Sequence, residues 1–399
     1  MTFPASTDPG DWRRYAMTND LILRAQALQP QLVYWRRQLH QCPEIGFELP
    51  RTRALLGELL EGMGIRCREE AGSLTFLIGT PESGKTILLR ADMDALPLQE
   101  GSGLSFAAPR NCHACGHDLH MSMLLGAVQL LCGLERLPCA VRVVFQCAEE
   151  TAEGARAFMH TDAFRSPAPD CALALHVQPE LDSGRINATP GNKMKSFDSF
   201  RCEFTGLGGH GASPWNARDP IAAAAQSCLL LGSLPGRLCN AQEQAVLSIG
   251  QFHAGTSANI IPETAFLEGT LRMRTREARA KLRAQMEQAV LHTASAFGCS
   301  GRLTWLSETP PLWNDPQMAH AAAQFLSDSG LEADDAPLPL PFSEDFAIIA
   351  EQVPTLYLNL GAHPEGTPRR FNHDPGVLYD ESVLWRGSAA LALCTLCFS

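Results

Sequence analysis

Residues 86–94 read TILLRADMD, a short apolar run that closes on acidic residues. A run of this length without alternating polar residues is typical of a strand that is buried on both faces of a sheet. Two more strand-length runs follow at residues 140–147 (AVRVVFQC) and 171–177 (CALALHV). Between them and the first run, residues 119–137 (LHMSMLLGAVQLLCGLERL) have the length and composition of a buried helix. This alternation predicts an α/β layer on a largely buried sheet.

The pattern changes after Gly191. Residues 196–207 (SFDSFRCEFTGL) alternate with a period of two and predict a strand with one exposed face. Residues 219–234 (DPIAAAAQSCLLLGSL) predict a helix whose first residues, Asp and Pro, are favoured at a helix start. Residues 276–297 predict a long amphipathic helix. These patterns predict that the middle of the chain forms a separate α+β unit.

Beyond about Pro310 the α/β rhythm returns, with a helix at residues 318–330 and a closing apolar helix near the C-terminus. The simplest interpretation is a discontinuous α/β catalytic domain formed by residues 1–192 and 307–399. An α+β domain at residues 193–306 would be inserted into it. We find no internal repeat and no low-complexity segment.

Composition restricts the class of protein. The 399 residues are 45% hydrophobic and 19% charged, enough for two domains with a large core. A formal net charge of −11 argues against nucleic acid as a partner. No secretory signal and no run of the roughly 18–20 apolar residues that span a bilayer is evident, so no membrane partner is expected. The 14 cysteines are scattered through apolar segments, which predicts a cytoplasmic protein with reduced, mostly packed thiols.

Residues 79–86 (GTPESGKT) match the phosphate-binding pattern GxxxxGK[ST]. That mechanism needs the loop to open a helix, so that backbone amides meet the phosphates. The loop instead leads into the apolar run at residues 86–94, which has no helical stripe. A polar hairpin turn that contains Pro81 and Gly84 between two strands fits better. A nucleotide-binding protein stays as a remote alternative.

Residues 111–120 (NCHACGHDLH) place six potential metal ligands in ten positions directly before the apolar helix: Cys112, His113, Cys115, His117, Asp118 and His120. Thiolate, imidazole and carboxylate together form a donor set for a transition metal, and zinc or manganese would be compatible. A c-type haem attachment would need histidine in place of Gly116. A structural zinc site would need a second CxxC nearby, and the other one lies in the closing apolar helix. A redox dithiol of Cys112 and Cys115 stays open as a rival interpretation.

Further chemical groups follow the ends of predicted strands. Glu149 and Glu150 come after the second strand, His176 ends the third, and Asp92 and Asp94 close the first. Adjacent residues that leave a strand point to opposite sides, so one glutamate can bind a metal while its neighbour acts as a general base. A lone histidine in an apolar strand is usually a core residue. However, open α/β sheets place their sites at the carboxyl ends of strands, where all these residues lie.

The sequence resembles the dinuclear metallopeptidase/aminoacylase family of the M20 type. It is most similar to the amidohydrolase branch that contains hippurate hydrolases and plant auxin-conjugate hydrolases. The motifs that carry the resemblance occur in order over nearly the whole chain: LHQCPEIGFEL, RADMDALP, CHACGHDLH, QCAEE, LHV, GGHGASP, the run from Asn259 to Arg272, SEDF and FNHDP. The resemblance implies a zinc-peptidase-like, three-layer α/β catalytic domain interrupted by a lid that mediates dimerisation.

The resemblance also implies a metal centre with two divalent ions per subunit, zinc or manganese. Its ligands would be Cys115, His117, Glu150, His176 and His373. The residues after His373 follow the family pattern only loosely, as GVLYDES.

Five more roles are implied by the resemblance. Glu149 would be the general base, and Asp94 would orient a ligand imidazole through a hydrogen bond. His210 would stabilise the oxyanion, and in dimeric members the lid histidine serves the active site of the partner. Asn259 and Arg272 would hold the α-carboxylate of the substrate, for which a guanidinium fork is well suited.

The chain departs from the family pattern at two places. It has Cys147 where relatives commonly have proline before the two glutamates, and Trp215 where they commonly have histidine after the proline of the lid motif. The position of Trp215, near the expected substrate pocket, could change the acyl-group preference.

The implied activity is metal-dependent hydrolysis of linear amides. The substrates would be N-acyl-L-amino acids, either hippurate-like, N-acetyl or other N-acyl conjugates, which yield a carboxylate and a free amino acid. Alternatives with the same mechanism are a dipeptidase and a biosynthetic N-acetyl-amino-acid deacetylase. A catalytically silent metal-binding relative is a further alternative.

Overall fold

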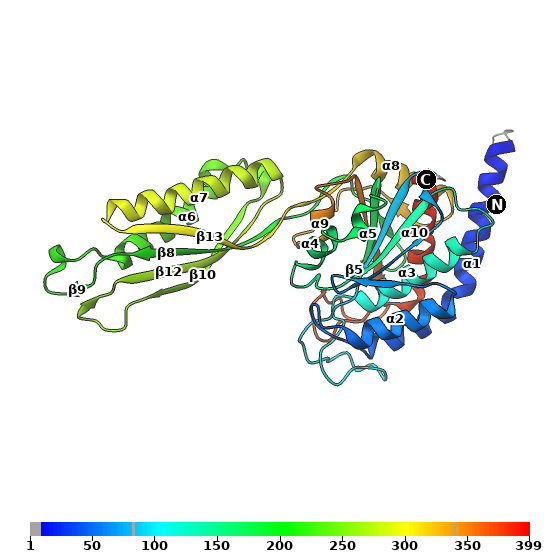
Figure 1. The fold of residues 1–399 in the computed structure, drawn as a ribbon, viewed down its shortest axis with the longest axis horizontal. Coiled ribbons are helices and arrows are strands. Elements are labelled where there is room, and N and C mark those ends of the chain that lie inside the picture. Colours follow the sequence, from blue (N-terminus) through cyan, green and yellow to red (C-terminus); the bar gives the residue numbers. More distant parts are fainter. Residues whose placement is uncertain (1–8, 82–83, 339) are drawn as a thin grey trace. The chain divides into compact units, whose positions relative to one another are not determined.

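The computed structural model describes residues 9–81, 84–338 and 340–399. The chain divides into two compact units, which are described separately (Figure 1). The larger unit comprises Met1–Lys193, Trp313–Leu338 and Ile348–Ser399. The smaller unit comprises Met194–Leu312 and Pro339–Ala347.

An eight-stranded sheet in the described part of the chain forms the centre of the larger unit, in the order β1-β2-β4-β3-β5-β16-β6-β15. Its strands are β1 (Arg68–Glu70), β2 (Ser73–Ile78), β3 (Thr86–Asp92), β4 (Ala140–Gln146), β5 (Cys171–Asp182), β6 (Ile186–Asn187), β15 (Ala333–Asp334) and β16 (Thr355–His363). The four neighbours β4, β3, β5 and β16 run parallel. Because parallel strands end at one edge, the residues that follow β3, β4 and β5 can meet there.

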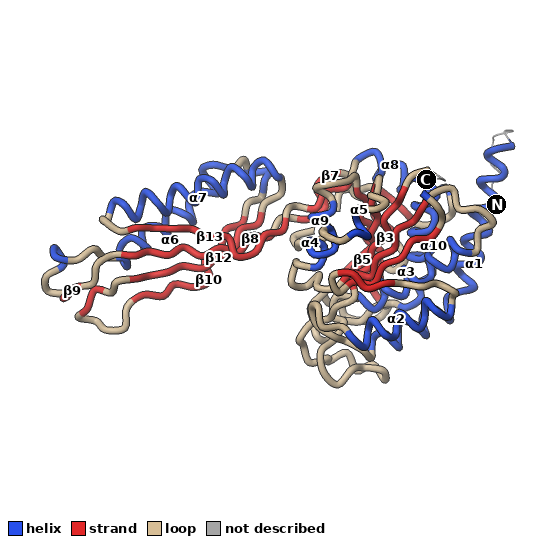
Figure 2. Tube along the Cα trace, in the orientation of Figure 1, coloured by secondary structure: helices blue, strands red, loops and turns tan. Residues whose placement is uncertain are grey.

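Helices cover both faces of this sheet (Figures 1 and 2). They are α1 (Pro9–His40), α2 (Pro50–Gly62), α3 (His117–Cys132), α4 (Gly154–Met159), α5 (Asp162–Arg165), α8 (Pro316–Asp328), α9 (Phe346–Ile349, shared between the units) and α10 (Leu384–Phe398). The predicted α/β architecture is confirmed. None of the helices in the described residues combines the length and the apolar character needed to cross a lipid bilayer.

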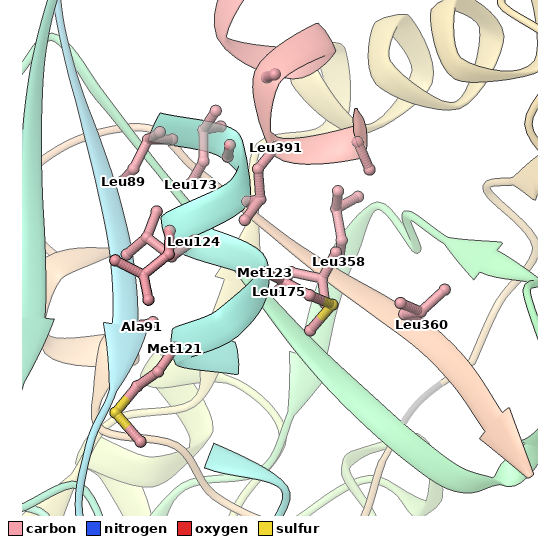
Figure 3. Close-up of a cluster of buried hydrophobic side chains, with 14 of the residues drawn as sticks. Leu89, Ala91, Met121, Met123, Leu124, Leu173, Leu175, Leu358, Leu360 and Leu391 are labelled. Atoms are coloured by element: carbon pink, nitrogen blue, oxygen red, sulfur yellow. The ribbon is translucent and has the colours of Figure 1, made fainter. Parts of the chain in front are cut away.

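The core lies between the sheet and α3, where apolar side chains of β3, β5 and β16 meet those of α3 and α10 (Figure 3). Figure 3 labels Leu89, Ala91, Met121, Met123, Leu124, Leu173, Leu175, Leu358, Leu360 and Leu391, all of them buried. α3 is apolar on nearly every side because the sheet, α1 and α10 all pack against it. This rigid packing fixes the first residue of α3, His117, at the sheet edge.

The smaller unit is a four-stranded antiparallel sheet, in the order β10-β12-β8-β13, with two helices. Its elements are β8 (Phe197–Thr205), β9 (Gly209–His210), α6 (Pro220–Leu238), β10 (Val246–Ala254), β11 (Ile260–Ile261), β12 (Thr264–Arg272), α7 (Arg276–Ala296) and β13 (Ser300–Thr309). The short strands β7 (Gly191–Met194) and β14 (Leu312–Asn314) pair with each other where the chain passes between the units. The predicted start of α6 is confirmed, because Asp219 accepts hydrogen bonds from the first amides of the helix.

Two details differ from the sequence interpretation. The predicted hairpin around Pro81 and Gly84 is wrong, because β4 lies between β2 and β3 in the sheet. Residues 82–83 of this segment lie outside the described residues. The chain enters strand β3 at Thr86, so the helix start that a phosphate-binding loop needs does not follow GTPESGKT. The expected domain boundary at residues 306/307 falls inside β13, which continues to Thr309.

Candidate metal centre and active site

The turn before α3 places two side chains at the edge of the sheet. Gly116 precedes the helix with a φ of 85°, in the left-handed region. A Cβ atom on Gly116 would lie 2.4 Å from Cγ2 of Val177, so glycine is required here for both its backbone freedom and its size. This tight turn lets Cys115 and His117, on either side of Gly116, lie at one site.

The five side chains expected to bind metal lie together in the larger unit. The Sγ atom of Cys115 is 3.4 Å from Nε2 of His176. Oε1 of Glu150 lies 3.8 Å from Nε2 of His117, and Oε2 of Glu150 lies 3.4 Å from Nε2 of His373. Donor atoms at such separations can share ions with bonds of about 2.0–2.3 Å.

The protonation of the two buried histidines fits a metal site. Nδ1 of His117 donates to the backbone carbonyl of Asp94 at 2.8 Å, so Nε2 carries the lone pair in the neutral ring. That Nε2 atom is buried and has no hydrogen-bond partner in the described residues. Burial lowers the pKa of His117 to about 3, and burial also holds the pKa of His176 well below its ordinary value. A neutral imidazole with an unused buried lone pair, such as that of His117, suits a divalent cation.

Asp94 supports the site in a different way from the prediction. Its carboxylate accepts the backbone amides of Glu149 at 3.0 Å and Glu150 at 3.1 Å. Oδ1 of Asp94 is 3.8 Å from Nδ1 of His117, too far for a hydrogen bond, because the backbone carbonyl of Asp94 takes that proton. Burial raises the pKa of Asp94 to about 7 against the effect of the two amides. The Asp94 carboxylate thus holds the turn that carries both glutamates.

Glu149, the expected general base, lies beside the metal-ligand cluster. Its Oε2 atom is 3.9 Å from Nε2 of His117, and its side chain is only 11% exposed. The turn that carries it begins at Ala148, whose φ of 54° is unusual for a residue other than glycine. Strained backbone of this kind is common at active sites.

A buried charge network behind α3 was not predicted from the sequence. Oδ2 of Asp118 accepts hydrogen bonds from Nε of Arg36 at 2.7 Å and from Nδ1 of His40 at 2.8 Å. Arg36 also contacts Glu381 at 3.0 Å. The sequence does hold a signal, since Arg36 and His40 are four residues apart and so share one face of α1. This network anchors α3 directly behind His117.

The other residues of the motif at 111–120 do not join the five. His113 is buried, and neither of its ring nitrogens has a hydrogen-bond partner in the described residues. Burial lowers the pKa of His113 to about 4. Burial raises the pKa of the Cys112 thiol to about 11, which makes it a poor nucleophile, and Cys112 and Cys115 form no disulfide. These features disfavour the redox interpretation.

In the smaller unit, His210 and Asn259 are close neighbours. His210 on β9 pairs with Ile260 on β11, and the carbonyl of Asn259 accepts the amide of Gly211 at 2.8 Å. The amide of Ala212 donates to Nδ1 of His210 at 3.0 Å, so the proton of the neutral ring is on Nε2. His210 can therefore act as a hydrogen-bond donor at the end of the sheet where β9 lies (Figure 1).

Arg272 lies at the other end of β12 from this pair. Arg272 is eight positions after Thr264, which is next to the β9–β11 extension, and a strand spans about 26 Å over that distance. Arg272 is half-buried over the ring of Phe197, and its Nη1 atom is buried without a hydrogen-bond partner in the described residues. Within one smaller unit, His210 and Arg272 are too far apart to contact the same small molecule.

Comparisons with known proteins agree with this architecture. Residues 88–395 match the model of peptidase family M20/M25/M40. An N-acetyl-L-cysteine deacetylase of Bacillus subtilis is 33% identical over 367 residues, which cover 90% of this chain and 86% of that protein. An N-acetyldiaminopimelate deacetylase of Streptococcus suis is 34% identical over 365 residues, covering 88% of this chain and 95% of the relative.

A solved structure gives the same result. The Bacillus subtilis YXEP protein, described as a dinuclear metal binding peptidase from the M20 family, has a TM-score of 0.80 and 31% sequence identity. The match covers 93% of this chain and 98% of that one. The chain therefore belongs to peptidase family M20/M25/M40. It is a hydrolase of amide bonds that depends on divalent metal ions.

Proposed function

We propose that the protein hydrolyses N-acyl-L-amino acids to a carboxylic acid and a free amino acid. The observation that carries this proposal is the position of Nε2 of His117, which is buried, has no hydrogen-bond partner among the described residues and lies beside the carboxylate of Glu149. The names of the Bacillus and Streptococcus relatives point to N-acetyl amino acids as the first substrates to test. N-benzoyl (hippurate-like) amino acids, other N-acyl conjugates and dipeptides are the alternatives.

Two zinc or manganese ions per subunit would be held by the five ligands, Cys115, His117, Glu150, His176 and His373. Divalent ions in such a site make bound water more acidic and polarise a carbonyl group. Glu149, next to this cluster, takes the proton of the attacking water and later delivers it to the leaving amine. We propose that this chemistry takes place in the cytoplasm.

The smaller unit would supply the remaining contacts as a lid and dimerisation domain. Nε2–H of His210 donates to the oxyanion that develops on the scissile carbonyl, a contact worth about 10²–10³ in rate. The half-buried guanidinium of Arg272 would bind the α-carboxylate of the substrate. Asn259 lies beside His210, so it would reach the same carboxylate as Asn259 of the partner subunit. Arg272 lies about 26 Å along β12 from Thr264, the end of the strand near His210, so we propose that His210 serves the active site of the partner in a homodimer.

The test is release of free amino acid from N-acetyl, N-benzoyl and N-indoleacetyl amino acids and from dipeptides, with added Mn²⁺ or Zn²⁺ and a chelator control. Chelator-sensitive release from an N-acyl amino acid supports the proposal. Release from dipeptides alone reassigns the protein as a dipeptidase, and silence across the panel with metal bound contradicts the proposal. The exposed Trp215 is a probe of acyl preference, since Trp215→His restores the residue common in relatives.

Glu149→Gln tests the general base. The variant should keep its metal and its fold but lose at least about 10²-fold in kcat, the smallest usual effect of a general base. Near-normal turnover of Glu149→Gln with metal bound would show that Glu149 is not the general base.

Mixing inactive variants tests the shared site. His210→Ala mixed with Glu149→Gln should regain part of the activity, because one site of the mixed dimer then has both residues intact. No recovery, despite proven subunit exchange, would contradict the exchange of His210 between subunits.

A further inference from the structure

Asp92 is a buried carboxylate that the expected ligand set leaves without a role. It ends β3, two residues before Asp94, and its side chain is about 1% exposed. Oδ2 of Asp92 accepts a hydrogen bond from Nη1 of Arg90 at 2.8 Å. The same oxygen lies 3.7 Å from Nε2 of His117, the buried nitrogen that has no hydrogen-bond partner in the described residues.

The neighbouring His120 is a support and not a ligand. The backbone amide of Val177 donates to Nε2 of His120 at 3.0 Å, so the proton of the neutral ring is on Nδ1. Nδ1 donates that proton to Oδ1 of Asp92 at 2.6 Å. Both ring nitrogens of His120 are therefore engaged, although the residue lies within reach of the cluster. The hydrogen bond from His120 fixes the orientation of the carboxylate.

Arg90, the cationic partner of Asp92, is held in place as well. Arg90 is itself buried, and its Nε atom also donates to Oε1 of Gln146 at 3.1 Å. A carboxylate oxygen of fixed orientation therefore lies beside Nε2 of His117.

From this arrangement we infer that Oδ2 of Asp92 is a ligand of the same metal ion as Nε2 of His117. Metal–nitrogen and metal–oxygen bonds are about 2.0–2.2 Å long, so two ligands of one ion lie at most about 4.3 Å apart. The separation of 3.7 Å meets this limit, as does the 3.8 Å distance from Nε2 of His117 to Oε1 of the expected ligand Glu150. The inference rests on the metal centre of the proposed function and adds a sixth side chain to it.

The competing explanation is that Asp92 only neutralises the buried charge of Arg90. Three variants separate the two explanations: Asp92→Asn, Arg90→Met and the double variant. If Asp92 only balances Arg90, removing both charges restores metal binding. If Asp92 is a ligand, the double variant binds zinc as weakly as Asp92→Asn does, and Arg90→Met alone binds zinc more tightly than either.

The measurement is competition for Zn²⁺ between each metal-free protein and a chromophoric chelator, with circular dichroism to check the fold. We expect two ions in the wild type and a loss of at least about 100-fold in affinity for one of them in the double variant, beyond the usual effect of a residue that only supports a ligand. A smaller loss in the double variant overturns the inference and leaves the proposed function standing. A wild type that binds no zinc overturns both. Should Asp92→Asn not fold, the double variant decides, because it leaves no unpaired charge at this pair.

Discussion

Replacing Arg36 with methionine tests the network behind α3, and Arg37 provides a matched control. The two arginines are adjacent on α1, both contact Glu381, and both lie over the ring of Phe106, at 5.1 Å and 5.0 Å. They differ in burial, because the side chain of Arg36 is 2% exposed and that of Arg37 is 50% exposed. Only Arg36 also pairs with the fully buried Asp118.

The expected loss follows from that difference. Removing one partner of a buried ion pair leaves an uncompensated charge and costs about 3–5 kcal/mol. An exposed pair such as Arg37 with Glu381 is worth about 0–1 kcal/mol. At about 2–4 °C per kcal/mol for a unit of this size, Arg36→Met should lower the Tm by roughly 10 °C and Arg37→Met by no more than a few degrees.

The assay is thermal and denaturant unfolding of the two metal-free variants beside the wild type. Adding Asp118→Asn to Arg36→Met should recover part of the loss, since the orphaned carboxylate is then uncharged. Equal losses for Arg36→Met and Arg37→Met would refute the claim that burial of the Asp118 pair stabilises this face of α3.

Two further predictions concern pH and the glutamate turn. Burial would lower the pKa of His40, but Asp118 raises this pKa to about 9. The protonated His40 therefore stabilises the fold fully below the ordinary pKa of 6.5, and this stabilisation is lost as the pH rises through 9. The free energy of unfolding should fall by about 3 kcal/mol as the pH rises over this range. Denaturation curves measured at a series of pH values should show this fall in the wild type and not in His40→Gln. The same fall in both proteins would contradict the role of His40. A Cβ on Gly154 would lie 1.6 Å from the carbonyl oxygen of Cys147, so Gly154→Ala should displace the turn that carries the glutamates, weaken zinc binding and lower the Tm. The control is Gly57→Ala in α2, where a Cβ would meet open space. This control variant should stabilise the protein by about 0.5–1 kcal/mol. Unchanged zinc affinity in Gly154→Ala would contradict this prediction, because the turn would then accommodate the added Cβ without moving the glutamates.

Much of the site could be predicted from the sequence because its residues follow strand ends. Glu149 follows shortly after strand β4, and His176 lies within strand β5; both strands are recognisable as largely apolar runs in the sequence. The parallel order of the strands then brings residues far apart in the sequence to one edge of the sheet.

The separate roles of Asp92 and Asp94 could not be predicted in this way. Both are acidic, buried and at the same strand end, and the sequence offers nothing that separates them. Only the folded structure shows that their hydrogen-bond donors differ. The carboxylate of Asp92 accepts from Arg90 and His120, whereas that of Asp94 accepts from the backbone amides of Glu149 and Glu150.

The connection between β2 and β3 is a second feature that local sequence does not define. A polar turn between two apolar strands is compatible with a hairpin and with a crossover. The placement of β4 between the two strands depends on long-range pairing that local residues do not encode.

Metal titration of the metal-free protein tests whether hydrolysis depends on two bound ions. Zinc or manganese is added in steps while metal binding and the release of amino acid from the best N-acyl substrate are measured in the same sample. We expect no hydrolysis without metal, a rate that rises to a plateau at two equivalents per subunit, and loss of that rate on chelation. Hydrolysis that persists in protein shown to be free of metal would contradict it.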